Sequence, residues 1–206
     1  SAFYHCVKLV TNLRLATPWL LFLLPLGGLL IVGLYQLFRD ENDTGTNLVL
    51  SAIHSNEEIP LRMAPLIFLS TLITHLFGGS AGREGAALQI GGSIGGSLGK
   101  LFRFNEKDKH IMIMCGMSAA FTALFGTPMA AAVFSIEVVS VGIMHYSALV
   151  PCVISALVSD GVSAYLGVKA ESFPLEHLPA FSLKAAVLVA LLAILSALVS
   201  ILFCIV

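Results

Sequence analysis

Charged residues are scarce in this chain. Only 11% of its 206 residues are Asp, Glu, Lys or Arg, whereas 57% are hydrophobic. A soluble domain carries about 25% charged residues because it needs a polar surface. The net charge is −1, so the basic footprint of a nucleic-acid-binding protein is missing as well. These shortages exclude an ordinary cytosolic enzyme, a disordered chain and a nucleic-acid partner, and they place the chain in a lipid bilayer.

Cysteine is also scarce, with four residues in the whole chain. Cys6, Cys115, Cys152 and Cys204 lie too far apart in sequence for a metal knuckle or a redox pair. Three of them sit in apolar runs, where a cysteine behaves as a small buried hydrophobe. The sequence therefore predicts neither a metal site nor a cofactor.

Uncharged runs of membrane-spanning length fill most of the chain. A spanning helix needs about 20 apolar residues, and backbone in lipid must form either helices or a closed barrel. Barrel strands alternate polar and apolar residues, whereas runs such as 20–34 are continuously apolar. We therefore predict an all-α, multi-pass integral protein of the plasma or inner membrane, with residues 1–206 forming a single transmembrane domain.

Breaks in these runs give the expected helices. Pro25 is expected to kink the first full span and Pro151 to interrupt a later one. Residues 85–99 would form a helix of only about 22 Å, which is too short to cross the bilayer and is typical of a mid-membrane binding site. Both chain ends look cut from something longer. The expected helices are 1–17, 19–38, 63–79, 85–99, 111–125, 129–141, 145–164 and 181–206.

The basic stretch 100–110 separates two of these helices. It holds more lysine and arginine than acidic residues, so the positive-inside rule places it in the cytoplasm.

A glycine-rich turn, residues 78–85, holds the most informative charges. Glu84 and Arg83 lie between two apolar segments, where an ionisable residue is expensive and usually functional. The helix that follows would direct its free N–H groups and positive dipole end at the turn, which makes an anion site. Glu84 would then act as a tethered anion whose protonation frees the site. A plain Arg83–Glu84 ion pair closing a surface loop is the alternative.

A second helix start lies near Gly45. Its backbone N–H groups and the Thr44 hydroxyl could add donors to an anion site, although an ordinary polar loop with a helix N-cap explains the same residues.

Two motifs resemble those of the CLC chloride channel and transporter family. G-R-E-G-A-A-L-Q-I-G, which begins at residue 82, is similar to the family's G-R/K-E-G-P motif with its following x-x-Q/H-I/L-G. Residues 115–137 are similar to its G-x-A-A-x-F-N-A-P segment, in the same order and at the same separation. The resemblance implies the first half of an inverted-repeat fold with broken and re-entrant helices. It also implies halide transport, without covalent chemistry, by a homodimer.

The resemblance also implies roles for individual residues. Glu84 would be the gating and proton-transfer group, and Thr44 and Gly45 would belong to the central anion site. The family's loop serine and proline are replaced by Thr44 and Asn47, which is similar to the fluoride-transporting branch. Ala86 replaces the proline after Glu84, and Val138 stands where exchangers often carry an internal proton-transfer glutamate, which argues against ordinary chloride/proton exchange. The resemblance thus implies proton-coupled halide antiport with fluoride preferred, and a passive chloride channel is the alternative. By the same resemblance, Gly82, Arg83, Gly85 and Ala86 would form the outer anion-binding loop.

Other residues allow further interpretations. Residues 91–95 match G-x-S-x-G, so an intramembrane serine protease is an alternative from another class. Gly91, Gly95 and Gly99 recur every fourth residue, as in close helix packing, and this interpretation is preferred. Glu137, between apolar runs, is either a proton relay or a buried acceptor for neighbouring backbone.

Overall fold

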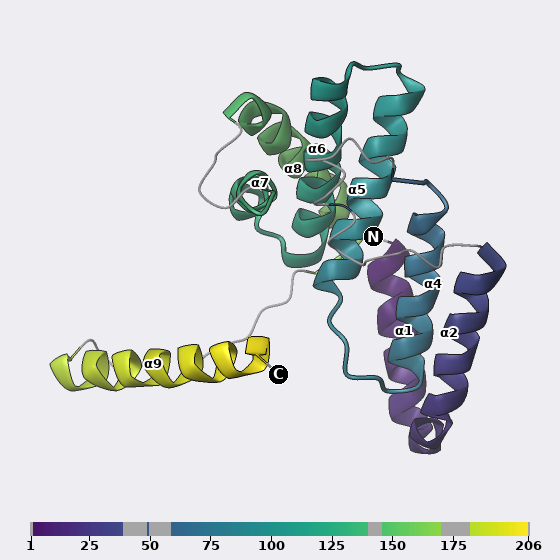
Figure 1. Cartoon of the computed structure of the whole chain (residues 1–206), viewed down its shortest axis with the longest axis vertical. Coiled ribbons are helices and arrows are strands. Elements are labelled where there is room, and N and C mark those ends of the chain that lie inside the picture. The colour runs from purple at the N-terminus through teal and green to yellow at the C-terminus, as the bar shows by residue number, and fades with distance from the viewer. Residues whose placement is uncertain (1, 39–48, 50–58, 140–145, 170–181, 206) are drawn as a thin grey trace. The chain divides into compact units, whose positions relative to one another are not determined.

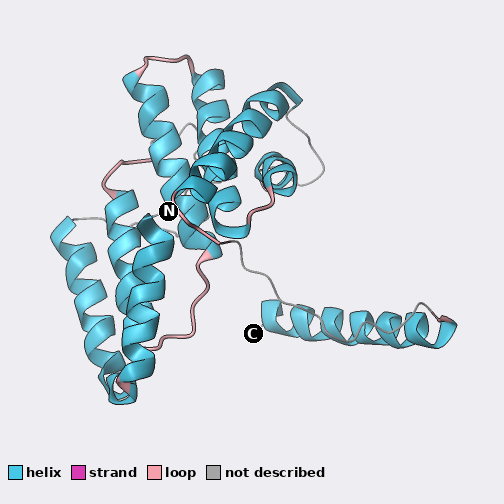
Figure 2. Ribbon diagram, turned by 180° about the vertical axis from the view of Figure 1, so that it is seen from behind, coloured by secondary structure: helices cyan, strands magenta, loops and turns pink. Residues whose placement is uncertain are grey.

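The computed structural model describes residues 2–38, 49, 59–139, 146–169 and 182–205. The secondary structure of these residues is helical, and they contain no strand (Figure 2). The chain divides into two compact units, Ser1–Glu171 and Ser172–Val206. The predicted all-α fold is therefore confirmed over the part of the chain that is described.

The first unit begins with a helical pair. Helix α1, Ala2–Ala16, is followed by a 3-10 helix, η1, over Pro18–Leu23, and then by α2, Leu24–Phe38. Pro25 is the second residue of α2, where proline is tolerated because the first-turn N–H groups have no partner inside the helix. The span expected at 19–38 is therefore divided into a 3-10 helix and an α-helix, and the change of helix type comes just before Pro25.

The next two described helices place the glycine-rich turn between them. Helix α4, Met63–Leu76, has 14 residues and α5, Glu84–Leu101, has 18. At helical rise they are about 21 Å and about 27 Å long, so each falls short of the roughly 30 Å hydrocarbon core. Helix α4 lies beside α1, α2 and α5 (Figure 1).

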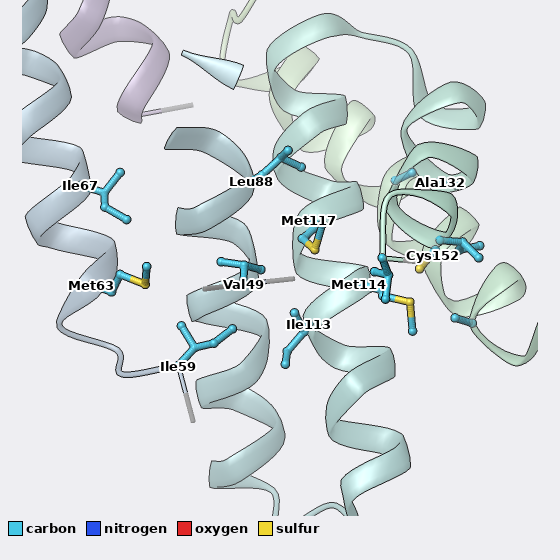
Figure 3. Close-up of a cluster of buried hydrophobic side chains, with 14 residues drawn as sticks. Val49, Ile59, Met63, Ile67, Leu88, Ile113, Met114, Met117, Ala132 and Cys152 are labelled. Carbon is cyan, nitrogen blue, oxygen red and sulfur yellow. The ribbon is translucent and has the colours of Figure 1, made fainter. Parts of the chain in front are cut away.

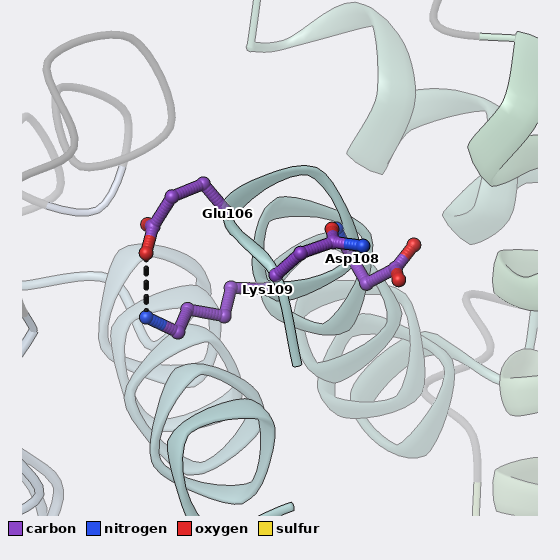
Figure 4. A network of polar contacts seen from close by, with 4 residues as sticks. Glu106, Asp108 and Lys109 are labelled. Atoms are coloured by element: carbon purple, nitrogen blue, oxygen red, sulfur yellow. Dashed lines mark hydrogen bonds and ion pairs between the residues drawn. The ribbon is translucent and has the colours of Figure 1, made fainter. Parts of the chain in front are cut away.

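Helix α6, Glu106–Phe125, begins five residues before the expected start at Ile111. Asn105 caps it, since its side chain accepts a hydrogen bond of 2.9 Å from the Asp108 backbone N–H. Lys109 forms an ion pair of 2.7 Å with Glu106 in the first turn (Figure 4). The polar residues of the basic stretch therefore start a helix, and only residues 102–105 connect α5 to α6.

The chain then turns sharply, as predicted. Gly126 ends α6 in a left-handed conformation with φ 66°, and Pro128 opens α7, Pro128–Glu137. After a 3-10 turn, η2, Tyr146–Ala148, comes α8, Leu149–Tyr165. Pro151 lies in the first turn of α8, where proline is tolerated, so the expected interruption of this helix was wrong.

Three described helices are long and apolar enough to cross a bilayer. The second unit contributes one of them, α9, Leu183–Ile205. Met63–Leu76 is apolar but shorter than the spanning length, so the span expected at 63–79 was too long. The three candidate spans are Pro18–Phe38, Tyr146–Tyr165 and Leu183–Cys204.

A buried apolar cluster joins α4, α5, α6, α7 and α8. Met117 and Ala132 are fully buried within it (Figure 3). Hydroxyl groups bind α8 to α6 nearby, since Ser118 donates to the Cys152 carbonyl at 3.0 Å and Ser155 to the Cys115 carbonyl at 2.9 Å. Such interhelical hydrogen bonds are typical of membrane helix pairs. They also bring the two cysteine sulfurs, 37 residues apart in sequence, to 4.0 Å.

Candidate anion-binding turn

The turn between α4 and α5 is shaped by its glycines. Gly78 has φ +76°, a conformation that side chains with a Cβ rarely adopt. The Gly79 N–H donates to the Thr74 carbonyl at 2.8 Å and so ends α4. A Cβ on Gly78 would lie 2.8 Å from Leu21 Cδ2, so the turn packs closely against η1. Glycine thus lets the backbone turn in a space that a larger residue would not fit.

Helix α5 directs unpaired backbone donors at this turn. Arg83 is its N-cap residue and makes no side-chain capping hydrogen bond. The first hydrogen bond of the helix runs from the Ala87 N–H to the Arg83 carbonyl at 2.9 Å. The N–H groups of Glu84, Gly85 and Ala86 therefore have no partner within the helix, and they coincide with the positive end of its dipole. This arrangement can bind an anion.

Glu84 is the first residue of α5, and its side chain is exposed. Its carboxylate folds back over Gly82, because a Cβ built on Gly82 would collide with Glu84 Oε2. The structure thus brings together the two ends of the G-R-E motif. A glycine at position 82 gives the carboxylate room to lie beside the donors of its own helix end.

Arg83 lines a basic cavity of about 420 Å³ next to the turn. Lys8 from α1, His75 from α4 and Lys169, which follows α8, line the same cavity. The His75 ring donates from Nδ1 to the Thr71 carbonyl at 2.8 Å, a bond within its own helix. Positive side chains from three parts of the sequence therefore line one cavity next to the turn. Lys8 and Lys169 were missed from sequence because neither is near a motif.

A second cavity, of about 170 Å³, lies where α2, α4 and α5 meet. Gly82 lines it, together with Ser70 and Gln89. Both polar residues were missed as functional candidates. The signal was available for Gln89, which is the single amide side chain in the uncharged stretch 85–99.

The glycines later in α5 lie against α6. A Cβ on Gly91 would collide with the Gly116 carbonyl oxygen, and one on Gly95 with the Met112 carbonyl oxygen. On Gly99 it would lie 3.4 Å from Lys109 Cα. The two helices thus approach at backbone distance along this glycine seam, which we define as Gly91, Gly95 and Gly99 of α5 with the facing residues of α6.

Ser93 is fully buried, and its hydroxyl donates to the Pro60 carbonyl at 3.0 Å. A hydroxyl held in this way is poorly placed to act as a protease nucleophile.

The remaining predicted site residues lie apart from the turn or outside the described part of the chain. Thr44 and Gly45 fall outside the described residues. Glu137 is the last residue of α7 and is exposed on this chain. Among the described residues, no group of three His, Cys, Asp or Glu side chains could hold a metal ion.

Comparison with known proteins identifies the family of the chain. The family model described as voltage gated chloride channel matches residues 27–206. The chain belongs to this family, the CLC family. CLC proteins are integral membrane proteins, in agreement with the apolar helices of this chain.

Similar CLC proteins are named after different ions. A chloride/fluoride channel protein of Pseudomonas syringae pv. tomato is 43% identical over 159 residues, which is 77% of this chain and 35% of the relative. The voltage-gated ClC-type chloride channel ClcB of Escherichia coli K12 is 29% identical over 162 residues, 76% of this chain and 37% of the relative. The chain thus spans little more than a third of the length of these curated relatives.

A solved CLC structure shares the fold. The crystal structure of a CLC-type fluoride/proton antiporter matches with a TM-score of 0.80 and 36% identity. The match covers 89% of this chain and 47% of that chain. The expectation that the chain forms the N-terminal half of a CLC fold is therefore confirmed.

Proposed function

We propose that the full-length protein transports a halide across the membrane in exchange for protons, with Glu84 as the gating and proton-carrying group. One observation carries the proposal: Glu84 is the first residue of a helix whose own terminal N–H groups have no partner within it. A carboxylate and a halide would compete for these donors. Protonation removes the charge of Glu84 and frees the donors for the halide.

The anion would be held by backbone rather than by a fixed charge. The N–H groups of Gly85 and Ala86 are the donors of the outer site, and Gly82 and Arg83 complete its loop. Arg83 and the basic cavity beside it would raise the local halide concentration, because positive side chains attract anions over several ångströms. Thr44 and Gly45 are proposed for a second, central site.

Fluoride is the proposed substrate in preference to chloride. The 36% identity to a fluoride/proton antiporter supports this choice. The replacement of the family's loop serine and proline by Thr44 and Asn47 points the same way. A passive chloride channel is the competing function, because similar proteins are named as a chloride/fluoride channel and as a chloride channel.

A flux measurement distinguishes these functions. The full-length protein is reconstituted into liposomes, and fluoride, chloride and proton movements are followed together with ion-selective electrodes. We expect fluoride efflux to drive proton uptake in the wild type and Glu84→Gln to abolish the proton movement. The matched control is Glu106→Gln, which removes an exposed carboxylate at the start of α6. Proton coupling that survives in Glu84→Gln would falsify the assignment, and chloride flux without protons would establish the channel.

Glu137 is proposed as a second carboxylate with a proton-transfer or a structural role. Its exposure at the end of α7 leaves it accessible to water or to other parts of the full-length protein. Glu137→Gln in the same assay separates the roles: lost coupling with normal stability indicates proton transfer, whereas lost stability indicates a structural role.

Two further proposals concern assembly and the protease alternative. The resemblance to the family supports a homodimer, which light scattering of the purified full-length protein would measure directly.

The bond from Ser93 to the Pro60 carbonyl argues against a serine nucleophile. Ser93→Ala should therefore leave halide transport largely intact, whereas it would eliminate a protease activity.

A further inference from the structure

The second cavity, between α2, α4 and α5, is lined by both polar and apolar residues. Ser70, Thr71 and Thr74 line it from α4 and Gln89 from α5, beside apolar residues such as Ile67. Among the described residues that line it, no carboxylate, amine or guanidinium group occurs. The polar groups of the lining are therefore uncharged, which suits water better than an ion.

Two atoms in this lining lack hydrogen-bond partners among the described residues. They are Gln89 Nε2 and Ser70 Oγ, and the two residues are only 7% and 9% exposed. The Thr74 hydroxyl, by contrast, donates to the Ser70 carbonyl at 2.8 Å and can still accept a further bond. Buried polar groups are almost always paired, either with protein or with ordered water. Two unpaired groups facing one cavity therefore indicate an occupant that donates and accepts hydrogen bonds.

Water fits both the space and the chemistry. A water molecule takes up about 30 Å³ of liquid volume and makes about three hydrogen bonds when buried. A cavity of about 170 Å³ has room for several such molecules. The amide of Gln89 would donate to one of them, and the hydroxyl of Ser70 could donate or accept.

The cavity reaches the proposed proton-carrying group. Gly82 lines it, and the Glu84 carboxylate lies directly over Gly82. Gln89 lies five residues further along the same helix, about one and a half turns deeper. The charged side chains around the turn, Arg83 and Lys8 among them, line the basic cavity instead.

We propose that this cavity is a hydrated proton reservoir for Glu84, in which Gln89 and Ser70 position the water. Protonated Glu84 passes its proton to a water oxygen, that water releases another proton toward the aqueous phase, and a carboxylate remains on Glu84. Gln89 and Ser70 do not titrate and act only by holding the water in line. The inference rests on the proposed role of Glu84 as proton carrier.

Hydration of the cavity is tested without transport. In full-length protein whose native cysteines are replaced, Ser70→Cys should react with aqueous Ag⁺, as measured by lost maleimide labelling after denaturation. The matched control is Leu66→Cys on the same helix, since Leu66 is 1% exposed and is not among the described residues lining the cavity. Equal protection of the two thiols from Ag⁺ would overturn the proposed hydration.

The relay is tested in proteoliposomes. Gln89→Leu should slow proton flux by about tenfold, the effect of about 1.4 kcal/mol on a barrier, and should change its solvent isotope effect. Gln89→His restores a hydrogen-bonding side chain and should recover much of the flux. Unchanged proton flux and isotope effect in a monodisperse Gln89→Leu protein would overturn the relay.

These outcomes are separable from those of the proposed function. If Glu84→Gln leaves coupling intact, the proposed function fails, whatever the thiol at position 70 does. If Glu84→Gln abolishes coupling and Gln89→Leu has no effect, only the relay fails. Should Gln89→Leu prove unstable, the Ag⁺ reaction at position 70 still decides whether the cavity is hydrated.

Discussion

The two ends of α5 are built in opposite ways. Along the glycine seam, Gly91 and Gly95 let the backbone of α6 approach so closely that a single Cβ would collide with a carbonyl oxygen. At the turn, by contrast, Gly82 accommodates only the movable carboxylate of Glu84. The same residue type therefore gives rigid packing at one end and room for a moving group at the other.

The difference shows where the stability and the activity of this protein are expected to reside. In lipid, the hydrophobic effect does not drive helices together. Close packing stabilises the helix pair instead, because it gains dispersion contacts. An anion site needs the reverse, namely backbone donors with no permanent partner. Identical substitutions at the two ends should consequently have different signatures.

The largest expected loss of stability follows Gly95→Ala. The added Cβ collides with the Met112 carbonyl, which belongs to backbone and cannot rotate away. Overpacking of this kind costs about 1–3 kcal/mol, seen as a lower thermal midpoint of the full-length protein in detergent. The control is Gly28→Ala in α2, where no described atom lies within 4 Å of the new Cβ. A Gly95→Ala protein as stable as Gly28→Ala would contradict the tight seam.

A smaller loss is expected where the seam's two helices are joined. Asn105→Ala removes the side-chain acceptor for the Asp108 N–H at the start of α6. Loss of an N-cap costs about 1 kcal/mol, measured in the same thermal experiment. Asn105→Ser supplies another capping oxygen and should restore most of the stability; failure to do so would mean that the cap is not the cause.

Gly82→Ala should change stability by no more than about 0.5 kcal/mol. Its Cβ meets the far end of the flexible Glu84 side chain, which can swing aside. Because the carboxylate then loses its resting place, the pH dependence of halide efflux should shift although the protein remains folded. Halide efflux measured across a pH series tests this prediction. A pH profile equal to that of the wild type would show that Gly82 does not determine the resting position of the Glu84 carboxylate.

The smallest effect is expected from the exposed ion pair of α6. Glu106→Gln breaks a contact of 2.7 Å between side chains that are 58% and 28% exposed. Exposed pairs of this spacing contribute about 0.3 kcal/mol, because water screens them. A double-mutant cycle with Lys109→Met measures the coupling, and a value well above 1 kcal/mol would show that the pair is shielded from water.

Much of the fold follows from local rules, and the error at Pro151 shows where they fail. The break between the helices expected at 111–125 and 129–141 is present, because a left-handed Gly126 ends one helix and Pro128 opens the next. Pro151 was misread as an interruption, since the sequence does not show that the chain switches from a 3-10 to an α-helix just before it. A proline at a first turn and one in mid-helix look alike when the starting residue is unknown.

Part of the candidate site was predicted from the sequence, and part was not. The motif around Glu84 is contiguous, so sequence alone located the carboxylate and the helix end that it starts. Ser70 approaches the turn from α4, whereas Lys8 comes from α1 and Lys169 from the segment after α8. Their proximity depends on how the helices pack, which no local pattern encodes.

Sequence by itself determined that this is a membrane-embedded, all-helical chain with a carboxylate at a broken helix, because charge content, run length and glycine placement are local properties. Only the tertiary structure decided which glycines meet backbone and which meet open space, and that Gln89 and Ser70 share one cavity. The physical reason is that packing and hydrogen-bond satisfaction depend on neighbours distant in sequence, and the fold alone selects those neighbours.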